Sequence, residues 1–242
     1  MPLVNFNLKV LQIILISVML GIISGCDILN SDGTSTESEA TFQMKIKEAN
    51  PYGNVASSSD GNISTESEEN EMELTEVKFF IEELELDGTN GTPDFEAEDL
   101  NDFIANIPLD GSPLEIDRIQ IPDGLYDEFE IEFEKPDDDD VEVTDRDFRD
   151  ETGAYSLVVK GIFNGEDFMF RSSEDFEIEL DLDPPVEFAD GSHSVLVLEI
   201  DVNHWFRDDA GMILDPKDPN NLETINENIE ASFEAYEDSF ED

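Results

Sequence analysis

The sequence is poor in the residue types on which most enzyme active sites depend. It contains one cysteine and two histidines, His193 and His204, in 242 residues. A single cysteine excludes an internal disulfide and a thiolate metal site in the body of the chain. The Gly-x-Ser-x-Gly motif of many hydrolases is absent, and a Ser-His-acid mechanism would have to use one of the two histidines as its base. No motif therefore identifies a reaction.

Basic residues are scarce as well, with 12 Lys and Arg against 63 Asp and Glu and a formal net charge of -51. Nucleic acid and anionic lipid headgroups both require a cationic face, so this charge excludes them as natural partners. Mutual repulsion among the acids predicts a fold that salt or divalent cations stabilise. Because apolar residues make up 38% of the chain and Phe occurs 17 times, a hydrophobic core can still form.

The main apolar run, residues 10–23, follows Lys9 and leads into Ile23-Ser24-Gly25-Cys26. Its basic start and its length are typical of a secretory signal, since a membrane-spanning helix needs roughly 20 apolar residues. Residues 23–26 resemble the lipobox of bacterial lipoproteins. This resemblance implies removal of residues 1–25 and acylation of Cys26, and therefore a lipid anchor in the cell envelope, with the outer membrane as the expected location. A plain cleaved signal and a membrane helix with a stray thiol are the alternatives.

The mature chain divides into a tether and one predicted domain. Residues 26–40 follow the cut site and are rich in Ser, Thr, Asp and Gly without an apolar period, which is typical of a flexible tether. Residues 41–242 contain about eight segments in which apolar and polar residues alternate. Strands are predicted over residues 41–47, 71–87, 114–121, 125–134, 155–171 (as a hairpin), 176–183 and 193–202. Their short spacing predicts an antiparallel β-sandwich.

Three of these segments carry further information. The apolar positions of residues 71–87 change parity at Glu82-Glu83, which predicts a β-bulge within one long strand, with a helix as the alternative. Asn164-Gly165 favours a type I′ turn that pairs Phe163 with Glu166 and Gly161 with Phe168. Pro184-Pro185 is expected to end the strand that begins at Phe176. Residues 99–107 have apolar positions at helical spacing and remain ambiguous.

The last segment is predicted to be an amphipathic helix. Apolar residues from Leu222 to Phe240 recur at intervals of three and four, and the opposite face carries only acids. Like charges at this spacing each cost roughly 0.2–0.5 kcal/mol. We therefore expect this helix to lose hydrogen-exchange protection before the rest of the chain as salt is removed. Finding it to be the best-protected segment at low salt would contradict this expectation.

Asp87, Asn90 and Asp94 are the candidate metal ligands, in a loop rich in oxygen-bearing side chains. Hard cations such as calcium take six to eight oxygen ligands, which this spacing could help to supply. The loop lacks the residue order of an EF-hand, so an ordinary polar loop is the alternative. The four consecutive acids 137–140 could also attract cations, but a solvated charge run is the favoured interpretation.

His204, Trp205 and Phe206 are candidate ligand-binding residues because they follow the strand predicted over 193–202. Exposed aromatic rings at a sheet end could bind a glycan, whereas a structural histidine at the rim of the sheet is the alternative. A copper site that uses both histidines with Met169 and Met212 has suitable ligand types but no tight spacing to support it.

The tethered cysteine, the strand-rich acidic body and the Trp-Phe pair before an Asp-Pro loop are together similar to uncharacterised lipid-anchored sandwich domains of Bacteroidota envelopes. This resemblance implies a fold and a location but no activity. We expect a non-catalytic binding or adhesion module whose partner is a glycan, an envelope protein or calcium. A structural subunit of a surface assembly and a hydrolase are the alternatives. A glycosidase needs two carboxylates at a suitable separation, and so acidic a chain would satisfy this requirement by chance.

Overall fold

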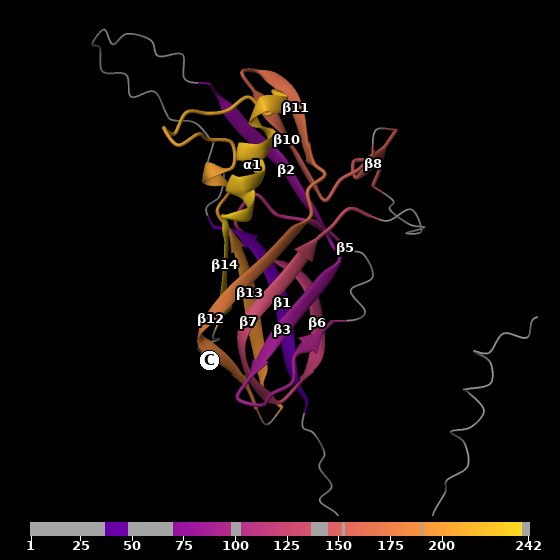
Figure 1. Ribbon diagram of the computed structural model, residues 1–242, viewed down its shortest axis with the longest axis vertical. Coiled ribbons are helices and arrows are strands. Elements are labelled where there is room, and N and C mark those ends of the chain that lie inside the picture. The colour runs from indigo at the N-terminus through magenta and orange to yellow at the C-terminus, as the bar shows by residue number, and fades with distance from the viewer. Residues whose placement is uncertain are drawn as a thin grey trace, which may run out of the picture. The chain divides into compact units, whose positions relative to one another are not determined.

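The computed structural model describes residues 37–47, 70–97, 103–136, 145–151, 153–189 and 191–238, which form a mainly β fold (Figure 1). The predicted signal peptide, Cys26, most of the tether and the acidic run 137–140 lie outside the described residues. The first strand begins at Glu37, four residues before the predicted domain boundary, because residues 37–40 pair with one neighbouring strand and residues 39 and 40 also pair with the other.

Three four-stranded sheets contain most of the strands. Sheet A contains, in spatial order, β14 (Phe233–Asp238), β13 (His193–Ile200), β1 (Glu37–Ile46) and β6 (Leu114–Pro122). Sheet B contains β11 (Glu166–Ser172), β10 (Leu157–Phe163), β2 (Met72–Ile81) and β5 (Phe103–Asn106). Sheet C contains β12 (Phe176–Phe188), β7 (Gly124–Phe133), β3 (Glu83–Thr89) and β4 (Phe95–Glu96). The short strands β8 (Arg149–Asp150) and β9 (Gly153–Ala154) pair with each other.

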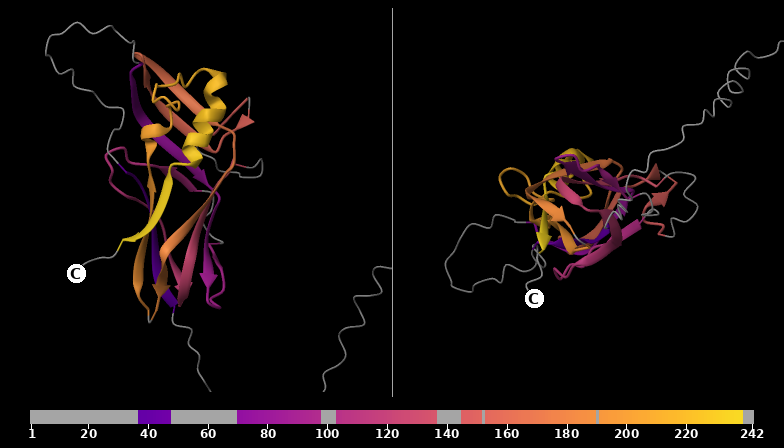
Figure 2. Two further views of the ribbon diagram at one scale, coloured as in Figure 1. Left: turned by 60° about the vertical axis from the view of Figure 1, so that its left-hand side comes forward. Right: turned by 90° about the horizontal axis from the view of Figure 1, so that it is seen from below.

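Sheets A and C form the two layers of the predicted sandwich, in the lower part of Figure 1. Their inner faces meet in the core, where the ring of Phe42 on β1 stacks on that of Phe129 on β7 at 5.9 Å. Sheet B and the helix α1 (Leu222–Glu230) lie above them (Figures 1 and 2). The β-sandwich is thus confirmed, with one departure from a wholly antiparallel arrangement, because β1 and β13 run parallel.

The parity change at Glu82-Glu83 marks a change of sheet, so the prediction of one bulged strand was wrong. The chain leaves sheet B at Ile81 and enters sheet C at Glu83. The side chains that face the core therefore change parity, as happens where a strand bends from one packed sheet into another. The exposed Glu82 is the single residue between the two strands.

Phe79 lies where the three sheets meet. Its ring is 4.5 Å from that of Phe133 in sheet C and 5.9 Å from that of Phe233 in sheet A. Trp205, which follows the 3-10 helix η1 (Val202–His204), meets the same ring edge-on at 6.0 Å. All four side chains are buried, so this cluster joins sheet B to the sandwich.

The β10–β11 hairpin was predicted correctly, including its register. Asn164 and Gly165 have φ of 52° and 79°, as a type I′ turn requires, and Phe163 pairs with Glu166 and Gly161 with Phe168. A Cβ atom on Gly161 would lie 2.6 Å from the Phe168 ring and 2.2 Å from the carbonyl oxygen of Glu73. Only glycine permits this close approach of ring and backbone.

Two other segments differ from their predictions. Pro184-Pro185 does not end β12, because the register against β7 shifts between Asp181 and Val186 and the pairing then resumes as far as Phe188. A strand can absorb prolines at such an irregularity, where ladder hydrogen bonds are already missing. The ambiguous segment 99–107 contains the strand β5, which pairs with β2.

The predicted C-terminal helix is correct only in its first half. After the 3-10 helix η2 (Pro219–Asn221), α1 ends at Glu230 and the chain continues as β14, which pairs with β13. Ser232 ends the helix, since its hydroxyl donates to the Ile229 carbonyl at 2.6 Å and accepts from Trp205 Nε1 at 2.8 Å. On sheet A the acids of β14 also gain basic neighbours, such as Lys47 at 3.0 Å from Glu234, which an isolated acidic helix would lack.

We expect Phe79→Ala to lower the free energy of unfolding by about 3–5 kcal/mol, because it leaves a cavity where the three sheets meet. Urea denaturation measures this change. Phe95→Ala is the control, since Phe95 is only partly buried at the edge of sheet C, and it should cost clearly less. Equal losses in the two variants would contradict the assigned role of Phe79.

Candidate functional site

The outer face of sheet C is a lattice of carboxylates. Strands β3, β7 and β12 each contribute three acids, namely Glu83, Glu85 and Asp87, then Glu128, Glu130 and Glu132, then Glu177, Glu179 and Asp181. The register places acid opposite acid, as in the row Glu85, Glu130, Glu179. No lysine or arginine occurs in the four strands of this sheet. Like charges placed directly opposite each other destabilise a sheet.

Proton affinities reflect this crowding. Burial, followed by repulsion from Glu177, Glu132 and Glu85, raises the pKa of Glu130 to about 7. Burial and neighbouring acids also raise the pKa values of Glu83, Glu85, Glu128 and Glu132. These carboxyl groups therefore hold their protons more tightly than isolated carboxyl groups do, and positive charge placed on this face would relieve the repulsion.

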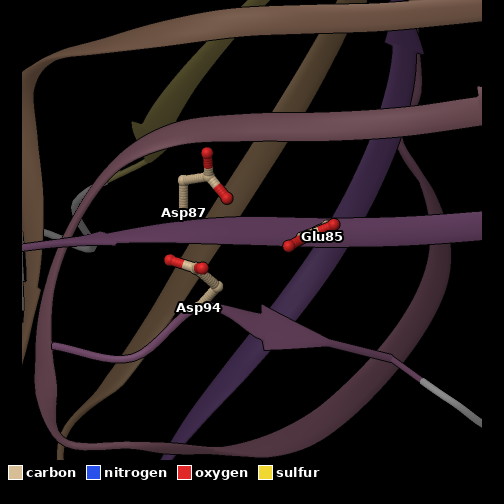
Figure 3. Close-up of side chains that lie close together, drawn as sticks. All are labelled: Glu85, Asp87 and Asp94. Atoms are coloured by element: carbon tan, nitrogen blue, oxygen red, sulfur yellow. The ribbon is translucent and has the colours of Figure 1, made fainter.

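Glu85, Asp87 and Asp94 converge at one end of the lattice (Figure 3). One oxygen from each carboxylate lies within 4.8 Å of the other two. Glu85 and Asp87 project from β3, and Asp94 precedes β4. Of the three predicted calcium ligands, Asp87 and Asp94 are thus brought together, and Asn90 lies in the turn between them at φ 55°.

Hydrogen bonds and close packing hold the loop between β3 and β4 and bring Asp94 near Asp87. The amide of Gly88 donates to Asp94 Oδ1 at 3.1 Å, and Thr92 Oγ1 accepts from the amide of Leu125 at 3.0 Å. A Cβ atom on Gly88 would lie 2.4 Å from the Thr92 carbonyl oxygen. Glycine at position 88 therefore allows the loop to fold back over the end of β3.

Glu130, Glu132 and Glu177 form a second group of carboxylates whose oxygens lie within 4.8 Å of one another, towards the end of the lattice away from Asp87. Sequence reasoning missed these residues and Glu85. The alternation of acids along each strand was visible in the sequence, but which strands are neighbours was not.

A hollow of about 420 Å³ adjoins the lattice at Asp87. It lies beside Asp127, an extra residue of β7 at which the pairing with β3 shifts. The pairing of β12 with β7 is interrupted at the same place, between Asp181 and Val186. Its lining consists of Asp87, Asp127, Glu128, Asp181, Leu182, Asp183 and Pro185. Carboxylate oxygens are the preferred ligands of hard divalent cations, so the chemistry of this surface suits calcium or magnesium and disfavours anions.

The aromatic site predicted at residues 204–206 is not an exposed surface. Trp205 and Phe206 are both 0% exposed, and Phe206 packs edge-on against Phe168 and Phe170 of β11. Of the three predicted residues only His204 is exposed. The expectation that these aromatic rings are exposed was wrong, because both rings pack into the core after the η1 turn.

The two histidines lie on different elements, His193 at the start of β13 and His204 at the end of η1. His193 Nε2 lies 2.9 Å from Thr41 Oγ1 and 3.7 Å from Glu39 Oε1. Both contacts use the same ring nitrogen. The residues named for a copper site are also spread over the fold, with His193 in sheet A and Met169 in sheet B.

No protein-family model, curated protein or solved structure matches the chain. Within the described ranges, no helix has the length and apolar character needed to span a membrane.

We expect Glu130→Gln to stabilise the protein at pH 8 and low salt by about 0.5–1 kcal/mol, because it removes a charge from a like-charged cross-strand row. The raised pKa means that folded Glu130 keeps its proton between about pH 4.5 and 7 while the unfolded chain releases it. Stability of the natural protein should therefore fall as pH rises through this window. The gain in the variant should vanish near pH 4.5.

Thermal unfolding from pH 4.5 to 8 measures this difference. Glu73→Gln is the matched control, since it removes the same charge from an exposed residue of β2 that faces Ile162. A pH-independent gain, or the same gain in both variants, would contradict the assigned repulsion.

Proposed function

We propose that the protein is a non-catalytic, lipid-anchored binding module of the bacterial cell envelope, and that the outer face of sheet C binds divalent cations. The observation that carries this proposal is the convergence of Glu85, Asp87 and Asp94 at the edge of a carboxylate lattice without a basic residue in its strands. The resemblance of residues 23–26 to a lipobox supports the envelope location and the acylation of Cys26.

Calcium is the favoured ion. Its flexible coordination by six to eight oxygens tolerates carboxylates from a strand and a loop, whereas magnesium demands near-ideal octahedral geometry. Glu85, Asp87 and Asp94 would hold the ion, and the neighbouring acids would raise its local concentration. Coordination positions that the protein leaves open could then be filled by oxygens of a glycan or of an envelope protein. In this proposal the ion connects the acidic domain to its partner.

Calorimetric titration of residues 27–242 with calcium in high sodium chloride tests the proposal, because monovalent salt screens diffuse attraction and leaves coordinated sites visible. We expect saturable binding with a rise in the melting temperature. At a free calcium concentration of about 100 times Kd, one site should add about 2.7 kcal/mol to the free energy of unfolding.

The variant Asp87→Asn with Asp94→Asn should lose this binding. The control Glu73→Gln with Asp209→Asn removes the same charge from two exposed residues outside sheet C and should bind as the natural chain does. A flat titration, or equal loss in both double variants, would contradict a coordinated site. Self-association at physiological salt without calcium would instead favour a structural subunit of a surface assembly.

A further inference from the structure

Sheet B carries a second, smaller apolar cluster on the face opposite the main core. Phe80 and Val158 lie on this face, and Phe148 covers them. Phe148 comes from the segment Asp145–Asp150, which ends in the strand β8. The rings of Phe80 and Phe148 are 6.2 Å apart, and Phe148 is 0% exposed. The segment is thus seated on the sheet through one buried aromatic ring.

Two lysines of sheet B hold the same segment by its acids. Lys78 Nζ lies 2.5 Å from Asp145 and 2.7 Å from Asp147, and Lys160 contacts Asp147 as well. Glu76, on the sheet itself, lies 3.0 Å from Lys78 and 2.9 Å from Lys160. The side chain of Lys78 is only 5% exposed, and its Nζ lies 5.9 Å from the centre of the Phe148 ring.

The charges of this cluster require an anionic occupant. Burial disfavours the charged form of Lys78, but the hydrogen bonds that it donates to the three carboxylates outweigh burial and leave its pKa above the ordinary value. Burial also raises the pKa of Asp147, and its hydrogen bonds with Lys160 and Lys78 more than reverse this, to about 2. Without the segment, Lys78 and Lys160 would share Glu76 as their one carboxylate partner among the described residues, which leaves an excess of positive charge on this face.

We infer that the outer face of sheet B is a binding site for an acidic segment with a terminal aromatic residue, Asp-x-Asp-Phe, which residues 145–148 fill within their own chain. The same segment of a second copy is the occupant that we propose in trans. The segment of a second copy carries the same two aspartates and the same phenylalanine. The segment seen in its own chain shows that these side chains fit the lysines and the apolar cluster of sheet B. The inference is independent of the proposed function, because this face shares no residue with the carboxylate face of sheet C.

A binding experiment requires a variant whose own segment has left the site, because that segment competes with any added one. A segment tethered beside its own site has an effective concentration on the order of millimolar, so an added segment competes poorly with it. The variant Asp147→Ala with Phe148→Ala removes both anchors of the segment. The main core should remain folded in this variant, because Phe148, Phe80 and Val158 form a cluster separate from it.

A fluorescent peptide with the sequence of residues 145–150 is the probe, and polarisation is the measurement. We expect the peptide to bind the variant Asp147→Ala with Phe148→Ala at least tenfold more tightly than the natural chain. Adding Lys160→Glu to that variant should abolish the binding. The control peptide carries asparagine in place of Asp147 and alanine in place of Phe148, and it should not bind. A folded variant that fails to bind the peptide, or binds both peptides equally, would overturn the site.

Exchange between copies is tested by mixing two full-length variants. The first lacks the segment anchors (Asp147→Ala with Phe148→Ala), and the second has an impaired acceptor (Lys160→Glu). Sedimentation velocity should show each variant as a monomer and the mixture as a one-to-one complex. Peptide binding without a complex in the mixture would overturn the second copy as the occupant. A complex formed equally well when the second variant also carries Phe148→Ala would overturn the assigned contact.

Discussion

The strict alternation of apolar and acidic residues in sheet C is the constraint on which the candidate site depends. Leu84, Phe129 and Ile131 must face sheet A to form the core, and a slip of one residue would bury carboxylates instead. The same register then fixes acid opposite acid on the outer face. Packing energy on one side of the sheet thus maintains electrostatic repulsion on the other, and protons or cations are what can reduce it.

Local patterns in the sequence predicted strands and turns, but not which strands become neighbours. The Asn164-Gly165 hairpin was predicted in full because a two-residue turn fixes its own register. The parity change at Glu82-Glu83 could not distinguish a bulge from a change of sheet. The apolar residues within 233–238 continue the helical spacing of α1, and only the pairing of this segment with β13 makes it a strand. The candidate site was found in part. Asp87 and Asp94 were predicted within one polar segment, whereas Glu85, which lies two residues before Asp87 on β3, was assigned to the strand alone.

The aromatic pair Trp205-Phe206 shows why an unusual local sequence does not by itself indicate a binding surface. Trp205 donates to Ser232 and packs on Phe79, and Phe206 packs on β11, so both stabilise the junction of the sheets. The surfaces with unbalanced chemistry lie elsewhere. The strands of sheet C contain no lysine or arginine. The outer face of sheet B instead carries two lysines, which form ion pairs with acids of the same chain.

A crystal structure of the chain grown in calcium, with anomalous data from a lanthanide-soaked crystal, would test the central claim most directly. The account predicts an ion among the oxygens of Glu85, Asp87 and Asp94, with calcium to oxygen distances of about 2.3–2.6 Å. An anomalous map without a peak at these three carboxylates, under conditions that saturate the calorimetric titration, would show that calcium binds elsewhere and would contradict the account.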